Sequence, residues 1–414
     1  MYLIIDEYDN FTNVILSEHG QQMFHDLTHA SGFYREYFKQ FKGMFDRIFM
    51  MGVSPVTLDD LSSGYNIDWN ISVDPRFNAM MGFDETEVRE MFHYYQQNDM
   101  LNGDVEAMIA EMKPWYDNYC FARKSLDDDR VFNCDMTLYY LRWQVDFHRA
   151  PEEMVDKNIR TDYSKLKMLA RIDRDSVQEG DRMSTIEKIA AEGDIFVDLH
   201  TSFPAERITD IDNFRSLLYY YGLLTMCGTR GDLIKMSIPN NCVREQYFGF
   251  LRDYYQKYSS IDLHYLNVML TDMAYDGRWK PFFESVAQAY RENSAVRDAM
   301  EGERNLQGFL KAYLALASYY LVEPELEMNY GYCDFFLLPD KKRYPDVKHS
   351  YILELKYATR TATDAELEVQ ALEGRNQLLQ YSEDKIVRCL SEGTTLHRLL
   401  LQFRGWDLVR CEEV

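Results

Sequence analysis

Three residues near the C-terminus have the types and the spacing that phosphodiester chemistry needs. Glu354 and Lys356 stand two apart in the run SYILELKY, so a strand places both side chains on one face, and Asp334 heads a second apolar run, FFLLP. Carboxylates are hard oxygen ligands for Mg²⁺ or Mn²⁺, and a neighbouring ammonium can orient a nucleophile or neutralise phosphoryl charge. On spacing alone, a solvated and salt-bridged strand face is the commoner explanation of Glu-x-Lys.

The elements that must position these residues are two strands and a helix. The apolar runs CDFFLLP and SYILELKY predict neighbouring strands, and residues 365–381 predict the helix that follows them. Helical patterns precede the strands up to about residue 320. We therefore expect an α/β domain with leading helices over residues 261–414.

The N-terminus predicts a second α/β region. MYLIIDEYD places an apolar run directly before Asp6 and Glu7, and a second run, RIFMMGVSP, spans residues 47–55. An amphipathic stretch lies between them and predicts a helix, so the order strand, helix, strand indicates a parallel βαβ unit. Continuous apolar runs are typical of strands covered on both faces, and we expect this for the first strand. A further helix is predicted over residues 84–97.

The middle of the chain predicts helices around a hairpin. The run TLYYLRWQVDF, which follows Asn133, and residues 214–223 have helical patterns, and the runs LLTMC and LIKMSIP flank Gly228–Asp232, a turn-forming segment. A helix follows from residue 242 to 258. Helix, hairpin and helix in this order are typical of a winged-helix-like module, which we place with its helical neighbours at residues 149–260.

The C-terminal segments resemble a known nuclease domain. ELEMNYGYCDFFLLP, followed by SYILELKYA and RNQLLQY, resembles the PD-(D/E)XK domain at the C-terminus of a family of bacterial AAA-ATPase-like proteins. The resemblance implies a restriction-endonuclease-like fold with Asp334, Glu354 and Lys356 as metal-binding and catalytic residues. It also implies that Gln377 and Tyr381, one helical turn apart, face the same site as auxiliary residues.

Other positions match that family less closely. Glu303, on the helix entering the domain, matches the family's first-helix carboxylate loosely, and an exposed helix acid is the alternative. Tyr332 stands where many relatives carry Arg, and Cys333 stands where the superfamily's namesake has Pro. A literal Pro-Asp occurs at residues 345–346, but only seven residues separate Asp346 from Glu354, within polar turn sequence. We therefore expect Asp346 to be a loop acid.

The N-terminal segments resemble the AAA-ATPase-like domain of the same family. LIIDEYD looks like a Walker B strand, and MMGVSP, GFDETEV, KPWYDNYCF and VFNCDMTLYYL resemble later segments in the same order. The resemblance implies that Asp6 binds Mg²⁺ through water, that Glu7 polarises the attacking water and that Ser54 is a sensor residue. A strand ending in exposed acids is the alternative for Asp6 and Glu7.

A P-loop is absent from this sequence. The phosphate-binding loop ends in Gly-Lys-Ser/Thr, and none of the 20 glycines is followed by lysine. We expect the missing strand and helix to lie upstream of residue 1, so residues 1–148 form a truncated AAA-like remnant. ATP is then a cofactor only if an upstream P-loop exists, and this chain is expected not to hydrolyse it.

Composition limits the other classes. The 414 residues carry a net charge of −23, with −13 in residues 1–150 and −5 in each of 151–300 and 301–414. Net charge governs steering, whereas binding depends on local patches, and Lys341, Lys342, Arg343 and Lys348 cluster between the two C-terminal strands. Seven cysteines without C-x-x-C and nine histidines without H-E-x-x-H argue against disulfide scaffolds and zinc hydrolases. No apolar run approaches the roughly 18 residues of a membrane span, so we expect a cytoplasmic protein.

These observations predict a metal-dependent nuclease. Asp334, Glu354 and the Leu355 carbonyl would bind Mg²⁺ or Mn²⁺, and Lys356 would orient the water that attacks DNA. DNA binding is expected to be weak and sensitive to salt. The alternative is a non-catalytic regulatory protein with relic sites that engages a protein partner or a second copy of itself. A third possibility is a nucleotide-gated switch in a longer protein.

Overall fold

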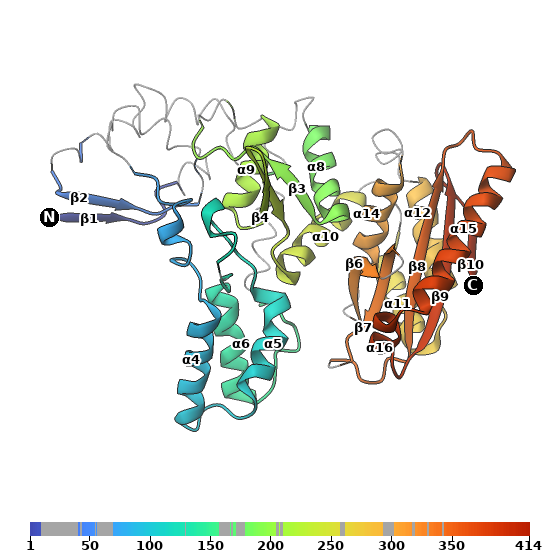
Figure 1. Cartoon of the computed structure of the whole chain (residues 1–414), viewed down its shortest axis with the longest axis horizontal. Coiled ribbons are helices and arrows are strands. Elements are labelled where there is room, and N and C mark those ends of the chain that lie inside the picture. Colours follow the sequence, from blue (N-terminus) through green and yellow to red (C-terminus); the bar gives the residue numbers. More distant parts are fainter. Residues whose placement is uncertain are drawn as a thin grey trace. The chain divides into compact units, whose positions relative to one another are not determined.

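The computed structural model describes most of the chain and divides it into two compact units. It describes residues 1–9, 40–41, 44–53, 55, 69–128, 130–156, 166, 169–170, 179–203, 207, 210–256, 261–292, 302–316, 319–328, 331–341 and 343–414. The first unit comprises residues 1–189 and 193–246, and the second comprises residues 190–192 and 247–414. Both contain helices and strands, which makes the protein a mixed α/β protein (Figure 1). The boundaries expected at residues 148 and 260 stay predictions.

The first unit begins with a two-stranded parallel sheet. Strand β1 (Tyr2–Ile5) pairs with β2 (Arg47–Met50), with Tyr2 opposite Arg47. The parallel pair is confirmed, and most of the predicted crossover helix lies outside the described residues. The expectation that β1 is covered on both faces is wrong for the described part of the chain. Tyr2 and Ile4 are 76% and 69% exposed, because no described element packs on the face that carries them.

Three helices of the first unit share one hydrophobic core. They are α4 (Glu85–Gln97), α5 (Val105–Tyr116) and α6 (Cys134–Phe147), and each begins after an Asp or Asn that caps its first turn. At α4, Asp84 and Glu87 form the reciprocal capping box, so the helix predicted over 84–97 is confirmed. Tyr116, from the aromatic segment KPWYDNYCF, is fully buried in this core. Short 3₁₀ turns, η2 (Pro75–Phe77) and η3 (Arg123–Ser125), precede α4 and α6.

A small antiparallel sheet completes the first unit. Strands β4 (Thr225–Arg230) and β5 (Leu233–Ser237) form the predicted hairpin, whose turn contains Gly231 with a positive φ of 61°. The sequence did not predict the third strand, β3 (Asp194–Val197), which pairs with β5 to give the order β3-β5-β4. Helices α8 (Glu179–Glu192), α9 (Ile211–Tyr220) and α10 (Asn241–Gln256) flank these strands in sequence.

The second unit is built on a five-stranded mixed sheet. Its strand order is β10-β9-β8-β7-β6. The strands are β6 (Tyr320–Met328), β7 (Gly331–Pro339), β8 (His349–Ala358), β9 (Thr395–Arg404) and β10 (Asp407–Glu413). The helices are α11 (Leu263–Asp276), α12 (Lys280–Glu292), α14 (Glu303–Leu314), α15 (Asp364–Ser382) and α16 (Lys385–Leu390). Strands β8 and β9 run parallel, and α15 forms the crossover between them (Figure 1).

Strand β8 lies at the centre of the sheet and is covered on both faces. Ile352 packs in one core with Ala371 and Leu378 of α15, whereas the hydroxyl of Tyr351 donates to the Met273 carbonyl of α11. Successive side chains point to opposite faces, so even-numbered residues of β8 face α15 and odd-numbered residues face the other helices. The strands predicted at CDFFLLP and SYILELKY and the helix over 365–381 are therefore confirmed.

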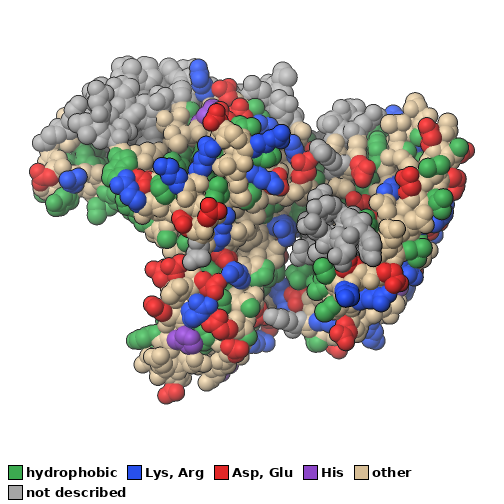
Figure 2. All heavy atoms as spheres, viewed as in Figure 1, with side chains coloured by type: hydrophobic (Ala, Val, Ile, Leu, Met, Phe, Trp, Pro, Cys, Tyr) green, Lys and Arg blue, Asp and Glu red, His purple; other side chains and the backbone are tan. Residues whose placement is uncertain are grey.

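Charged side chains of both signs occur on the face of the protein that Figure 2 shows. Figure 2 shows acidic side chains interspersed with Lys and Arg over both units on the face that it views. In the part of the chain that the structure describes, no helix has the length and apolar character needed to cross a bilayer.

Candidate active site

Asp334 lies where strands β7 and β8 separate. The antiparallel pairing of the two strands includes Phe335 opposite Leu353 and does not continue to Asp334. The separation leaves the Leu355 N–H without a strand partner on that side, and Asp334 Oδ2 accepts it at 2.7 Å. Asp334 Oδ1 accepts a hydrogen bond from the Gln307 side-chain amide of α14 at 3.0 Å. The fork between the strands thus holds a fixed carboxylate.

Glu354 is a buried carboxylate beside this fork. Its side chain is 4% exposed, and its Oε1 accepts a hydrogen bond from the Lys356 ammonium at 2.8 Å. Its Oε2 is buried and has no hydrogen-bond partner among the described residues. A buried carboxylate oxygen without a partner is costly, so this atom marks a position where a cation or a donor is needed.

Lys356 is held between the strand and α15. Its ammonium also donates to the Gln377 side-chain oxygen at 2.7 Å. Its aliphatic stem passes over Gly374, where an added Cβ would lie 3.3 Å from Lys356 Cε and 2.7 Å from Leu400 Cδ1. The helix therefore approaches the strand closely at Gly374 and fixes the course of the lysine side chain.

Burial and mutual repulsion perturb both carboxyl groups. Desolvation raises the pKa of Asp334 to about 6, and the nearby Glu303 charge adds to this, while the Leu355 N–H opposes it. Desolvation, followed by the Asp334 charge, raises the pKa of Glu354 to about 7, against the opposing effect of Lys356. Two carboxyl groups that resist ionisation together favour a bound cation.

The domain that contains Asp334, Glu354 and Lys356 matches a known protein family. Residues 301–413 match the family model of the PD-(D/E)XK nuclease superfamily, and residues 1–62 match a model described as predicted AAA-ATPase. The chain carries a PD-(D/E)XK superfamily domain. The resemblance of the C-terminal segments is thereby confirmed, and so is that of LIIDEYD and MMGVSP at the N-terminus. The later AAA-like segments, from GFDETEV on, lie outside the matched residues and stay predictions. Searches of curated proteins and of solved structures gave no match.

The PD-(D/E)XK domain brings further predicted residues toward the fork. Tyr381 is 2% exposed, and its pKa is raised by burial and by the charges of Glu354 and Asp334, with Gln377 opposing the shift. Glu303 lies in the first turn of α14 and is exposed, as in the alternative interpretation of this residue. Its pKa is raised because the carboxyl group is partly desolvated, with Lys356 opposing the shift. The side chain of Tyr332 lies outside the described residues.

Two residues of this site were missed in the sequence. Gln307 lies one turn after Glu303 on α14, and that i, i+4 spacing is the one signal that could have placed it beside the predicted acid. Gly374 lies in the middle of α15, where glycine costs about 1 kcal/mol relative to alanine. A glycine at an unfavourable helix position indicates a close approach, which its contact with Lys356 demonstrates.

The loop between β7 and β8 contains the competing Pro-Asp and the basic cluster. Asp346 is exposed in a turn, as expected for a loop acid. Lys341 donates to the Glu392 carbonyl, and Lys348 is exposed. Lys342 lies outside the described residues. The loop thus places basic side chains near the strands, and one of them, Lys341, is hydrogen-bonded to the loop before β9.

The N-terminal acids have a different environment. Asp6 and Glu7 are exposed, Glu7 has a positive φ of 50°, and its N–H donates to Asp6 Oδ1 at 2.9 Å. Ser54 lies outside the described residues. Asp9, which the sequence did not single out, is 2% exposed and accepts the Val53 N–H at 3.1 Å and 3.2 Å. Asp9 thus ties the segment after β1 to the end of β2.

Proposed function

We propose that this protein is a metal-dependent nuclease that cleaves DNA through its PD-(D/E)XK domain. The observation that carries the proposal is the buried, unpartnered Oε2 of Glu354 in the described site, next to Asp334 and Lys356. Burying a carboxylate is costly unless its oxygen atoms have partners, and the ion pair with Lys356 supplies a partner to Oε1 alone. A divalent cation would satisfy it.

The oxygen atoms at the fork suit Mg²⁺ or Mn²⁺. Asp334 and Glu354 supply carboxylates, and Leu355 supplies a carbonyl, which are the hard donors these ions prefer. The N–H and C=O of one strand residue point to the same side, and the Leu355 N–H points at Asp334, which directs its carbonyl to the same fork. When bound, the ion supplies a water of lowered pKa and stabilises phosphoryl charge.

The remaining side chains have positioning roles in the proposal. Lys356 orients the attacking water and neutralises developing charge, and Gln377 holds its ammonium in place. Tyr381 supports the site from α15 as a buried and neutral side chain. Glu303 contributes negative charge at the mouth of the site, where it raises the pKa of both ligands and so strengthens their demand for a cation.

A cleavage assay tests the proposal. Labelled single-stranded DNA, duplex DNA and RNA are incubated with the protein and Mn²⁺ or Mg²⁺, alongside Glu354→Ala and, as a matched control, Glu373→Ala on the exposed face of α15. We expect metal-dependent cleavage of DNA by the parent and by the control, and its loss in Glu354→Ala. Equal cleavage by all three proteins, or none of any nucleic acid, would overturn the proposal.

The second candidate is a non-catalytic protein with a relic site. The ion pair of Glu354 with Lys356 favours it, because an occupied carboxylate oxygen is a poorer ligand. Calorimetric titration with Mn²⁺ separates the two candidates. Binding that is lost in Asp334→Asn supports the nuclease, and no Mn²⁺ binding by the parent protein supports the relic that engages a protein partner.

We infer that the AAA-like part does not hydrolyse ATP in this chain and acts in regulation. Support comes from the lack of Gly-Lys-Ser/Thr in the sequence and from the exposure of Asp6 and Glu7. These residues alone provide no cradle for phosphates, so no catalytic step is assigned to them. Stoichiometric ATPase activity that Glu7→Gln abolishes would contradict this inference.

Two further assignments belong to this proposal. The order β3-β5-β4, with a hairpin between α9 and α10, supports a winged-helix-like module in the middle of the chain. Cytoplasmic localisation is supported by cysteines that show no disulfide framework in the sequence. Deletion of the hairpin tip, Gly231 and Asp232, with an unchanged affinity for DNA, would argue against a role of the module as a DNA-binding wing.

A further inference from the structure

The carboxylate of Asp334 accepts one hydrogen bond on each oxygen, from two different elements. The Gln307 side-chain amide of α14 donates to Oδ1 at 3.0 Å, and the Leu355 N–H of β8 donates to Oδ2 at 2.7 Å. An ionised carboxylate offers about four lone-pair positions on its two oxygens, so one position on each oxygen is already used. The two donors therefore fix the orientation of the carboxylate and leave each oxygen one position for a further ligand.

Gln307 is carried by a helix that is itself packed against the sheet. The preceding residue, Leu306, is fully buried, and Lys311, one turn after Gln307, is 1% exposed. The Lys311 ammonium lies 5.8 Å from the ring centroid of Phe335, the residue that follows Asp334 on β7. Helix α14 is thus attached to β7 beside Asp334, so the Gln307 amide cannot follow a carboxylate that turns away from it.

Gln307 orients Asp334 without bringing a charge to it. A lysine or an arginine at this position would pair with the carboxylate and compete with a bound cation, whereas a second carboxylate would repel it. The amide does neither, and its N–H is the group that an ionised carboxylate needs, because such a carboxylate only accepts hydrogen bonds. The arrangement therefore suits a carboxylate that is held in place and still available to a cation.

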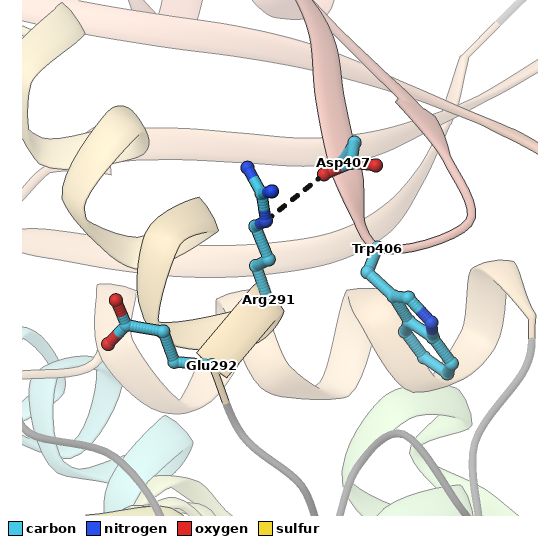
Figure 3. Close-up of a pocket in the computed structure, with 4 residues that line it drawn as sticks. All are labelled: Arg291, Glu292, Trp406 and Asp407. Atoms are coloured by element: carbon cyan, nitrogen blue, oxygen red, sulfur yellow. Dashed lines mark ion pairs between the residues drawn. The ribbon is translucent and has the colours of Figure 1, made fainter.

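Another acid of the same unit shows the opposite arrangement. Figure 3 shows Trp406 and Asp407 opposite the end of α12, where they line a cavity of about 450 Å³ with Arg291 and Glu292. Asp407 pairs there with Arg291 at 3.3 Å, and both side chains are more than half exposed. A solvated carboxylate with a cationic partner has little demand for a metal ion. The neutral donor and the burial together distinguish Asp334 from Asp407.

A carboxylate that cannot turn suits one class of divalent cation. Mg²⁺ requires near-octahedral geometry with oxygen ligands at about 2.0–2.1 Å, and Mn²⁺ shares the octahedral preference. Ca²⁺ takes about six to eight oxygens at about 2.3–2.6 Å in flexible geometry, and it binds carboxylates through one oxygen or through both. Binding through both oxygens requires a carboxylate that can turn toward the ion. The restrained Asp334 therefore fits a small six-coordinate ion better than Ca²⁺.

We propose that Gln307 is a positioning residue that favours small six-coordinate cations over Ca²⁺ by holding Asp334 in one orientation, an inference that rests on the proposed nuclease function. Gln307 acts through Asp334 and takes no part in the chemistry. Without its amide, the carboxylate can pivot about the hydrogen bond from the Leu355 N–H. The fit to an octahedral ion is then lost, whereas a larger ion with flexible geometry still finds its ligands.

Calorimetric titrations with Mn²⁺ and with Ca²⁺, in the absence of nucleic acid, test the proposal. Gln307→Met keeps the length of the side chain and removes the donor. Gln288→Met makes the same change at an exposed position of α12 and serves as the control. We expect Gln307→Met to bind Mn²⁺ about tenfold more weakly and Ca²⁺ within about twofold of the parent, so the preference for Mn²⁺ falls about tenfold. Gln288→Met retains both affinities.

The outcomes separate this inference from the nuclease proposal. An unchanged ratio of the Mn²⁺ and Ca²⁺ affinities in Gln307→Met would overturn the Gln307 assignment alone, because general damage to the site weakens both ions alike. If the parent protein bound neither ion, both proposals would fall. Thermal melting by circular dichroism with chelator present verifies that each variant is folded, and Gln307→Ala replaces Gln307→Met if the methionine variant is not.

Discussion

The two pairs of acids at opposite ends of the chain, Asp6 with Glu7 and Asp334 with Glu354, look alike in sequence and differ in the structure. Each follows or interrupts an apolar strand. The N-terminal pair is exposed beside a two-stranded sheet. The C-terminal pair lies at a fork in a five-stranded sheet, where burial raises both pKa values. The pKa of an acid is raised when surrounding elements bury its carboxyl group, which is typical of functional sites. A position at the end of an apolar strand does not by itself provide that burial.

The largest expected effect contrasts one acid from each pair. Asp334→Asn removes a charged ligand from the fork, so we expect DNA cleavage with Mn²⁺ to fall roughly 10³-fold or more. Asp6→Asn, assayed without nucleotide, leaves cleavage unchanged because its carboxylate is solvated and belongs to the other unit. Initial rates on labelled DNA provide the measurement. A comparable loss of cleavage rate in both variants would show that the two pairs of acids do not differ in this way.

The second prediction uses the raised pKa values of Asp334 and Glu354. Their folded values of about 6 and about 7 exceed the unfolded values of about 3.9 and 4.3, so the folded state binds protons more tightly. Their contribution to stability is full below about pH 4 and is lost as pH rises through the folded pKa values. With chelator present, we expect the C-terminal unit to lose on the order of 6 kcal/mol between about pH 4 and pH 8.

Urea unfolding at a series of pH values measures this loss, with Trp279 and Trp406 as fluorescent reporters in that unit. Asp334→Asn serves as the comparison, because removing one charge of the pair also relieves its partner. The variant should have a flatter dependence on pH than the parent. Parallel pH profiles for the two proteins would show that the buried acids are not the source.

The candidate site was predictable where spacing along one element decides geometry. Glu354 and Lys356 share a strand face because the period is two, and Gln377 lies one turn from Tyr381 on one helix. Gln307 and Gly374 were not predictable, because their contacts depend on how α14 and α15 pack on the sheet. The prediction that β1 is covered on both faces was wrong for a related reason. An apolar run indicates that burial would be favourable, but it does not show which element packs on the strand.

The third prediction concerns the close approach of α15 to β8. Gly374→Ala adds a Cβ that must displace the Leu400 and Lys356 side chains, so we expect the Lys356 ammonium to shift and cleavage to fall about tenfold. The affinity for Mn²⁺ should remain within about twofold, because the ligands on β7 and β8 do not contact the new methyl group. Glu373→Ala, one residue earlier on the exposed face, is the control. Wild-type cleavage by Gly374→Ala would show that Lys356 has room to adapt.

The smallest effect is expected at Asp9, the buried acid of the N-terminal segment. Asp9→Ala removes the acceptor of the Val53 N–H, and losing a buried, charge-assisted hydrogen bond costs about 1.5–3 kcal/mol. We expect hydrogen exchange of residues 47–53 to accelerate at least about tenfold, whereas Asp6→Ala leaves it unchanged and neither variant alters DNA cleavage. Equal exchange in both variants would mean that Asp9 does not hold β2. Faster exchange in Asp9→Ala alone would assign the two aspartates separate roles, with Asp9 maintaining the fold and the exposed Asp6 contributing nothing to it.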